Sequence, residues 1–412
     1  MRARTDAARR VAALSAISGS DPVVRQLLGQ LFDPNIGFPD RPLFIDDVDV
    51  FEMPDGLGFF IPGGETPALL RGRFANAAIA YLRPLLDGAH TVEQLLVTSP
   101  PGLPVQALIR TLLVLHSKGL LTREGSTAGY RGDEVGRRQR LYWGRHLALT
   151  RSASCAGEID QRLMRARVLL VGTGLFGAAV ADLLSRTGVG RIDVVGWDDD
   201  GTIGVAVDGM PGTSSLLLPT TDVDQAISVV DGLVEGVDLL ITATCDAPQA
   251  FLEEMNELAL AARVWWLIGN SAGSAVDLGP LVLPYESACY TCLLLRQRSA
   301  EPIAVEREIY QESKRGPRHA GERDVIGESV WASTQAASFL VGEAVRVLSG
   351  IAAPTLTDSV LRLLPVSGIL ERNQVLRVPR CPACYRGDVP ATAIDLQPSQ
   401  AGRSGEWETA PR

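Results

Sequence analysis

The chain has 412 residues, enough for two or three domains, and its composition of 46% hydrophobic and 21% charged residues is that of an ordinary globular protein. The net charge of −9 gives no global attraction to nucleic acid. No apolar run is long enough to cross a bilayer, and the N-terminus lacks a signal-peptide pattern, so we expect a cytoplasmic protein with neither a nucleic-acid nor a membrane partner.

The first 124 residues contain two patterns. Residues 1–40 are predicted to form an N-terminal helical arm, in which Val23–Phe32 has helical spacing and Pro34, Gly37 and Pro39 end the helix. Residues 41–124 begin with three predicted strands, separated by Asp55-Gly56 and Gly63-Gly64 turns. Their sequences are PLFIDDVDVFEM, LGFFIPG and ETPALLRG.

Three helical segments follow these strands. They are Phe74–Leu86, Thr91–Val97, which Thr91 and Gln94 open as a capping box, and Pro104–Gly119, which has a wide apolar face. Three strands and three helices in this length are typical of a small α+β winged-helix module. The last helix carries few basic residues for phosphate contacts, so an exposed strand edge that pairs with an extended peptide is the alternative use.

Residues 125–140 are glycine-rich and charged, which predicts a linker, and residues 141–385 have the pattern of an α/β domain. Within it, Ala166–Asp200 reads as strand, glycine turn, helix and strand. Gly172, Gly174 and Gly177 form G-x-G-x-x-G in that context, which predicts a Rossmann-like unit. Further strands are expected at 238–244, 263–268 and 278–283, and a long helix at Val330–Leu348. Residues 386–412 are polar and predicted to be a disordered tail.

Four of the six cysteines form two C-x-x-C pairs, Cys289/Cys292 and Cys381/Cys384. In a reducing compartment such pairs indicate a structural zinc site rather than disulfides. Cys155 and Cys245 stand alone, and we interpret both as small buried hydrophobic residues.

The α/β part resembles the ThiF/MoeB/HesA family of ubiquitin-activating-like adenylyltransferases. The matching stretches occur in the family's order: YWGRHLALT, RLMRARVLLVGTGLFG, DLLITATCD, LGPLVLPYESACYTC and RCPAC. The resemblance implies a Rossmann-like ThiF-type fold whose last two stretches hold the four-cysteine zinc. It also implies a homodimer, in which Arg145 would reach across to the neighbouring nucleotide site.

The sequence departs from active members of this family at the nucleotide site. Gly196 stands where an acid usually ends the second strand, and Thr242 and Cys245 replace the two acids of the family's D-A-T-D-N motif, with Asp246 one place late. Adenylation needs charge stabilisation on the phosphates. We therefore expect a vestigial nucleotide site that makes ATP binding doubtful. Its residues are Gly172, Gly174, Gly177, Arg145 and Asp246.

The whole chain resembles one branch of the family, the leader-peptide-binding, cyclodehydratase-type ThiF-like proteins of thiazole/oxazole-modified peptide biosynthesis. In that branch the N-terminal module is a recognition element for the precursor's leader, and the ThiF-like body docks a YcaO-type, ATP-dependent cyclodehydratase. The resemblance implies a non-catalytic scaffold. The expected peptide-binding residues lie on an edge strand and the third helix: Thr66, Ala68, Leu69, Leu70, Arg71, Val105, Leu108, Leu112 and Leu115.

Two other functions stay open at this point. The first is an ATP-dependent adenylyltransferase that acts on a peptide or carrier-protein carboxylate through an unusual nucleotide site. The second is a winged-helix regulator, against which the sparse basic charge argues. The four histidines are scattered and have no partners at a recognisable catalytic spacing.

Overall fold

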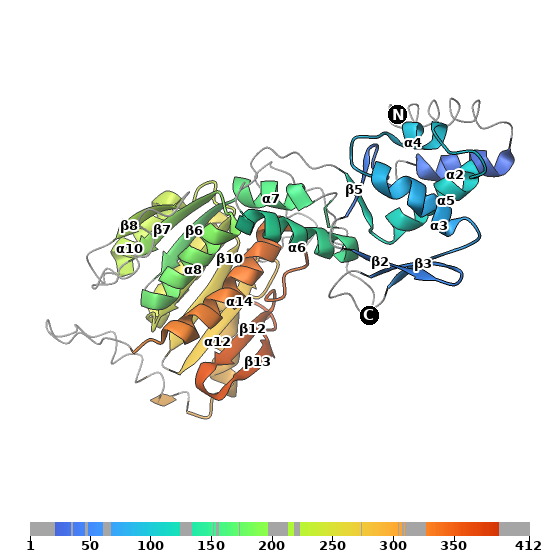
Figure 1. Cartoon of the computed structure of the whole chain (residues 1–412). Coiled ribbons are helices and arrows are strands. Elements are labelled where there is room, and N and C mark those ends of the chain that lie inside the picture. Colours follow the sequence, from blue (N-terminus) through green and yellow to red (C-terminus); the bar gives the residue numbers. More distant parts are fainter. Residues whose placement is uncertain are drawn as a thin grey trace. The chain divides into compact units, whose positions relative to one another are not determined.

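The computed structural model describes residues 21–386, with gaps at 34–35, 46–47, 61–66, 124–133, 151, 154–155, 173, 197–212, 218–222, 273, 304, 307–308 and 310–326. The predicted tail, 386–412, therefore lies outside the described residues except for Arg386. The chain divides into two compact units, Met1–Gln161 and Arg162–Arg412. Figure 1 labels many of the elements of both units.

The strands of the first unit form two small sheets. β1 (Pro42–Phe44) pairs antiparallel with β5 (Leu121–Arg123), which ties the beginning of the predicted 41–124 module to its end. β2 (Asp49–Met53), β3 (Gly56–Phe60) and β4 (Ala68–Arg71) form an antiparallel sheet in that order. The stretch 42–53, predicted as one strand, contains two, because its first part pairs with β5 and its last part with β3.

The helices of the first unit agree closely with the sequence pattern. The capping box at Thr91 and Gln94 is confirmed, since the Thr91 side chain accepts from the Gln94 amide and the Gln94 side chain accepts from the Thr91 amide. The helices are α2 (Pro22–Leu31), α3 (Ala75–Leu82), the 3-10 turn η1 (Arg83–Leu85), α4 (Val92–Val97), α5 (Val105–Ser117) and α6 (Glu134–Thr150).

Two boundaries differ from the expectation. α2 does not form a separate arm, because Val24, Leu28 and Leu31 are buried in the same core as the helices that follow. α6 begins at Glu134, inside the segment 125–140 that was predicted as a linker. The core of the first unit therefore includes α2 as well as the elements of 41–124.

The second unit is built on an eight-stranded sheet with the order β13-β12-β11-β10-β9-β6-β7-β8. The five strands from β8 to β10 are parallel, and β11, β12 and β13 continue the sheet antiparallel. The strands are β6 (Arg167–Gly172), β7 (Arg191–Gly196), β8 (Thr213–Leu217), β9 (Leu239–Cys245), β10 (Trp266–Ala272), β11 (Ala275–Val282), β12 (Ser359–Leu364) and β13 (Ile369–Gln374). The predicted Rossmann-like α/β architecture is thus confirmed in its large, mostly parallel sheet.

Helices cover both faces of this sheet. α8 (Gly174–Thr187) and α14 (Val330–Ser349) lie side by side on one face (Figure 1). α10 (Val223–Leu233), α11 (Gln249–Ala262) and α12 (Tyr290–Ala300) pack on the other, and α7 (Ala156–Arg165) leads into β6. Among the described helices, none has both the length and the apolar character that a membrane crossing requires.

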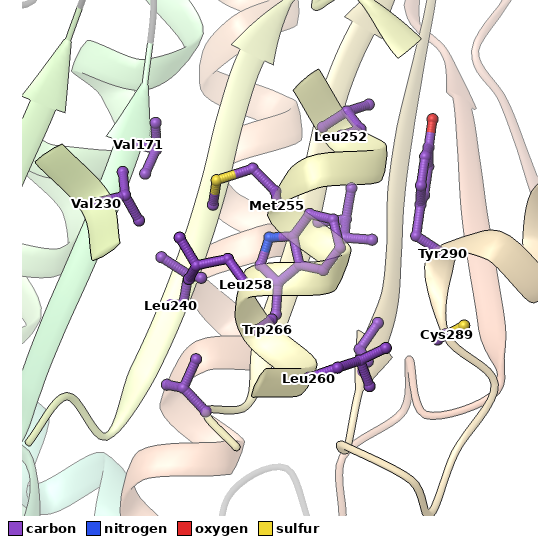
Figure 2. Packing of buried hydrophobic residues seen from close by; sticks show 14 of the residues in the cluster. Val171, Val230, Leu240, Leu252, Met255, Leu258, Leu260, Trp266, Cys289 and Tyr290 are labelled. Carbon is purple, nitrogen blue, oxygen red and sulfur yellow. The ribbon is translucent and has the colours of Figure 1, made fainter. Parts of the chain in front are cut away.

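The core on the α11 face is packed around Trp266 of β10, whose side chain is completely buried (Figure 2). Met255 and Leu258 of α11 surround it, with Leu240 of the neighbouring β9. Successive strand residues face opposite helix layers, so these parallel strands are buried on both sides and read as continuous apolar runs. This explains why the sequence identified β6 and β9 so directly.

A buried carboxylate connects α14 to the loop before β12. Glu343 is 1% exposed and accepts from the Leu356 amide at 2.6 Å and from the Thr355 hydroxyl at 2.9 Å. Arg346 adds an ion pair at 3.1 Å. A buried charge with this many partners is compensated, and removal of the carboxylate leaves its donors without an acceptor.

We therefore expect Glu343→Ala to lower the free energy of unfolding of the second unit by about 2–4 kcal/mol. The measurement is thermal unfolding followed by circular dichroism. Glu371→Ala is the matched control, because Glu371 is exposed on β13 and its loss should change stability by less than about 0.5 kcal/mol. Equal midpoints for the two variants would contradict the role of Glu343.

Candidate functional site

The four cysteines predicted to bind zinc come together in the second unit. Cys289, Cys292, Cys381 and Cys384 are all buried, and their sulfur atoms lie within 4.8 Å of one another. The Sγ–Sγ distance is 3.8 Å for Cys289–Cys292, 3.8 Å for Cys289–Cys381 and 3.6 Å for Cys292–Cys384. A tetrahedral zinc with Zn–S bonds of about 2.3 Å separates its sulfurs by about 3.8 Å, so the cluster fits this ion.

Local structure holds each pair of thiols in place. Cys289 is the N-cap of α12, and Cys292 is in its first turn. Cys381 and Cys384 lie in the loop after β13, where the Cys381 amide donates to the Val378 carbonyl at 3.1 Å. Hydrogen bonds from Cys289 lower the pKa of Cys292, which favours its thiolate form. A metal would therefore join α12 to the C-terminal loop, and four protein ligands leave no open position for chemistry.

The glycines of the predicted nucleotide loop lie at the end of β6 and in the first turn of α8. Gly172 is the last residue of β6, Gly174 begins α8 with a φ of +58°, and Gly177 is buried inside the helix. The neighbours of β6 are β7 and β9, whose connections run in opposite directions along the sheet. This is the topological switch point, where sheets of this type bind ligands.

A residue that the sequence did not identify occupies this point. The Glu328 carboxylate accepts from the Leu175 amide at 2.9 Å and from the Phe176 amide at 3.4 Å. The thiol of Cys245, at the end of β9, donates to the same carboxylate. Glu328 is separated from the loop by about 150 residues in the chain, so no spacing pattern could have indicated the contact.

The departures from the family pattern have structural counterparts. Gly196 is the last residue of β7 and is buried, so the strand end itself carries no carboxylate for a ribose hydroxyl. Thr242 is completely buried within β9. Cys245 is half-buried and bonded to Glu328, so the interpretation of Cys245 as a buried hydrophobic residue was wrong. Asp246 has a left-handed φ of +50° directly after β9.

Arg145, the remaining member of the predicted nucleotide site, is in α6 of the first unit. Its side chain lies outside the described residues, as does the stretch Trp197–Asp200 with its three acids. The proposed reach of Arg145 across a dimer stays a prediction.

The predicted peptide-binding residues separate into accessible and inaccessible ones. Leu108, Leu112 and Leu115 are completely buried in the core of the first unit, which corrects their assignment to a peptide groove. α5 needs these leucines to pack against its neighbouring helices, so a single apolar face could not serve both uses. Val105 is half-buried at the start of the helix.

The predicted edge strand is β4, and it alternates as a half-buried strand should. Leu69 is 38% exposed and Arg71 is exposed, whereas Leu70 is buried. Ala68 is half-buried against the core, and Thr66 lies outside the described residues. β4 pairs with β3 on one side, and no other described strand pairs with its second edge.

Comparison with known proteins places this fold. The chain is 27% identical over 252 residues to the sulfur carrier protein ThiS adenylyltransferase of Escherichia coli (strain K12), which covers 55% of this chain and 88% of that protein. No protein-family model matches. The chain is similar to the ThiF/MoeB adenylyltransferases.

Solved structures share this fold. E. coli MccB with MccA-N7isoASN is 14% identical, with a TM-score of 0.57, over 83% of this chain and 99% of MccB. A heterocyclase in complex with substrate and cofactor is 19% identical, with a TM-score of 0.55, over 83% of this chain and 39% of the heterocyclase. At these identities the likeness shows a shared fold.

MccB has also been solved with ATP, at 14% identity and a TM-score of 0.56 over 83% of this chain and 99% of MccB. The expectation that ATP binding is doubtful therefore finds no support in the comparisons. That expectation rests only on the residues of this chain at the switch point.

The cysteine cluster generates a direct prediction. The purified protein should contain about one zinc per chain, because four clustered thiolates make a closed tetrahedral site. The double variant Cys381→Ser/Cys384→Ser should lose the metal and melt at a lower temperature, since the metal links α12 to the C-terminal loop.

Metal content by inductively coupled plasma mass spectrometry tests this. Cys245→Ser is the matched control, because it removes a thiol outside the cluster and should keep its zinc. Two results would contradict the zinc site. One is a protein that holds no zinc after purification without chelators, and the other is a double variant that keeps all of its zinc.

Proposed function

We propose that this chain captures the leader segment of a ribosomally made precursor peptide and presents it to a YcaO-type cyclodehydratase for thiazole or oxazole formation. The first unit recognises the leader, and the ThiF-like unit is a scaffold without catalytic residues of its own. The products would be thiazole/oxazole-modified peptides, such as thiopeptides or bacteriocins. The similarity to MccB, solved with MccA, and to a heterocyclase, solved with substrate and cofactor, supports a role in peptide modification.

The observation that carries this proposal is the second edge of β4, with which no other strand in the described part of the chain pairs. An unpaired edge presents a row of amide and carbonyl groups, which is a template for another strand. The four residues of β4 are enough for a short ladder with an extended peptide. Backbone hydrogen bonds supply most of the affinity in this mode of binding, so the exact side chains of β4 matter less than its accessibility.

An apolar row on the open face of the sheet adds side-chain contacts to this edge. Phe51, Gly58 and Leu69 are directly opposite one another on β2, β3 and β4. Phe51 is 42% exposed and Leu69 is 38% exposed, and a Cβ atom at Gly58 would overlap the Phe51 ring. A leader that alternates apolar and acidic residues would direct its apolar side chains onto Leu69 and Phe51.

The second unit supplies the partner surface in this proposal. It would dock the cyclodehydratase and form a homodimer, as the resemblance implies. The zinc would be structural, because its four buried thiolates exclude substrate.

The second candidate function is ATP-dependent adenylation of a peptide or carrier-protein carboxylate. The similarity to the ThiS adenylyltransferase and the structure of MccB with ATP favour it. Three residues at the nucleotide site argue against this candidate. Gly196, Thr242 and Cys245 stand where acids would bind ribose or magnesium. Exchange of pyrophosphate into ATP by the isolated protein would favour this candidate over the first.

Strand addition predicts the effect of a backbone change in β4. We expect the full chain to bind the leader with roughly micromolar affinity, about −8 kcal/mol. Ala68→Pro should weaken binding at least about tenfold, because proline removes a backbone donor and distorts the edge strand. The measurement is fluorescence polarisation with a labelled synthetic leader peptide that alternates apolar and acidic residues.

Two controls separate the backbone from the side chains. Leu69→Ala keeps the ladder and should weaken binding less than Ala68→Pro. Val97→Ala changes an exposed residue of α4 and should bind like the unaltered chain. A folded Ala68→Pro variant with unchanged affinity would contradict the proposal.

A further inference from the structure

The side-chain carboxylate of Glu328 lies against the glycine loop of the second unit, at the start of α8. Oε2 of Glu328 accepts from the Leu175 amide at 2.9 Å, and Oε1 accepts from the Phe176 amide at 3.4 Å and from the Cys245 thiol. A Cβ atom at Gly174 would overlap the Glu328 carboxylate. The missing side chain at Gly174 is thus what allows the carboxylate to approach the backbone.

The amides that hold Glu328 are those that a phosphate would use. The first amides of a helix have no partner inside the helix, and the helix dipole favours negative charge there. After a glycine-rich turn at a switch point, this arrangement binds phosphate groups. The same donors cannot serve a carboxylate and a phosphate at once, and two anions a few ångströms apart repel each other.

We propose that Glu328 is an internal competitor that closes this loop to polyphosphate ligands such as nucleoside triphosphates. The loop can accept such a ligand only after the Glu328 side chain leaves it. Cys245 reinforces the closed state, because its thiol donates to the carboxylate from the end of β9. A carboxylate at position 245, as in the family pattern, would repel Glu328 instead, so the exchange of an acid for a thiol and the closure of the loop are consistent with each other.

The contact is confined to one side chain, which makes it reversible without unfolding. Glu328 directly precedes Ser329, the N-cap of α14, and it is half-buried. The packing of α14 on α8 fixes the position of the Glu328 backbone. Rotation of the side chain about its own bonds would expose the Leu175 and Phe176 amides and leave α14 in place.

A purely structural role is the competing explanation, in which Glu328 only caps α8. The two explanations differ in what removal of the carboxylate does to binding. If Glu328 is only a cap, its removal destabilises α8 and creates no affinity for polyphosphate. If Glu328 is a competitor, its removal frees the site for polyphosphate. The apparent dissociation constant for polyphosphate then falls, because a larger fraction of the molecules has an open loop.

The experiment compares the full chain with Glu328→Ala, Glu328→Gln and the control Glu371→Ala. Calorimetric titrations with ATP and magnesium, and with inorganic tripolyphosphate, measure the affinities. We expect Glu328→Ala to bind each ligand about tenfold more tightly than the unaltered chain, equivalent to about 1.4 kcal/mol. Glu328→Gln should change in the same direction by less, since an amide keeps the size and loses the charge. Glu371→Ala should bind like the unaltered chain.

Hydrogen exchange followed by mass spectrometry gives a readout without ligand. The segment 174–180 should exchange faster in Glu328→Ala than in Glu371→Ala, because its first amides lose their acceptor. Affinities for both polyphosphates that stay unchanged in Glu328→Ala and Glu328→Gln would overturn the proposal. Exchange of this segment that stays as slow as in the control would overturn it as well.

Discussion

The first amides of α8 need an acceptor, and residues from separate elements of the second unit meet that requirement. Buried amides without partners are costly, so a helix that begins at a switch point must find an anion, water or a side chain. In this chain the acceptor is Glu328, which α14 positions by packing along α8. Gly174 makes room for the carboxylate, and Cys245 donates to it from the next strand.

The sheet framework of this fold and the groups at its switch point depend on different residues, so one can vary without the other. The parallel strands and the helices on both faces depend on apolar burial around residues such as Trp266. The cysteine cluster ties α12 to the C-terminal loop at a place that the chemistry of the switch point does not use. Neither feature requires an acid at position 196, 242 or 245. The fold therefore follows the ThiF-like pattern, whereas activity has to be judged from the site.

The sequence predicted features that depend on local patterns. The strand, turn and helix at 166–187, the capping box at Thr91 and the paired cysteines each show their physical cause within a few neighbouring residues. Contacts between distant residues could not be predicted in this way. Glu328 is an ordinary acid in the sequence, and only the packing of α14 brings it to the glycine loop. Amphipathic spacing also could not tell whether Leu108, Leu112 and Leu115 face a core or a ligand, because both uses require the same residues.

The central claim is that the leader peptide pairs with β4 of the first unit. The ThiF-like second unit neither holds the peptide nor modifies it. A crystal structure of the full chain with the leader peptide tests this most directly. The account predicts a peptide strand hydrogen-bonded to the backbone of Ala68–Arg71, with its apolar side chains against Leu69 and Phe51. A leader held only by residues 162–386, with the edge of β4 left unpaired, would contradict it.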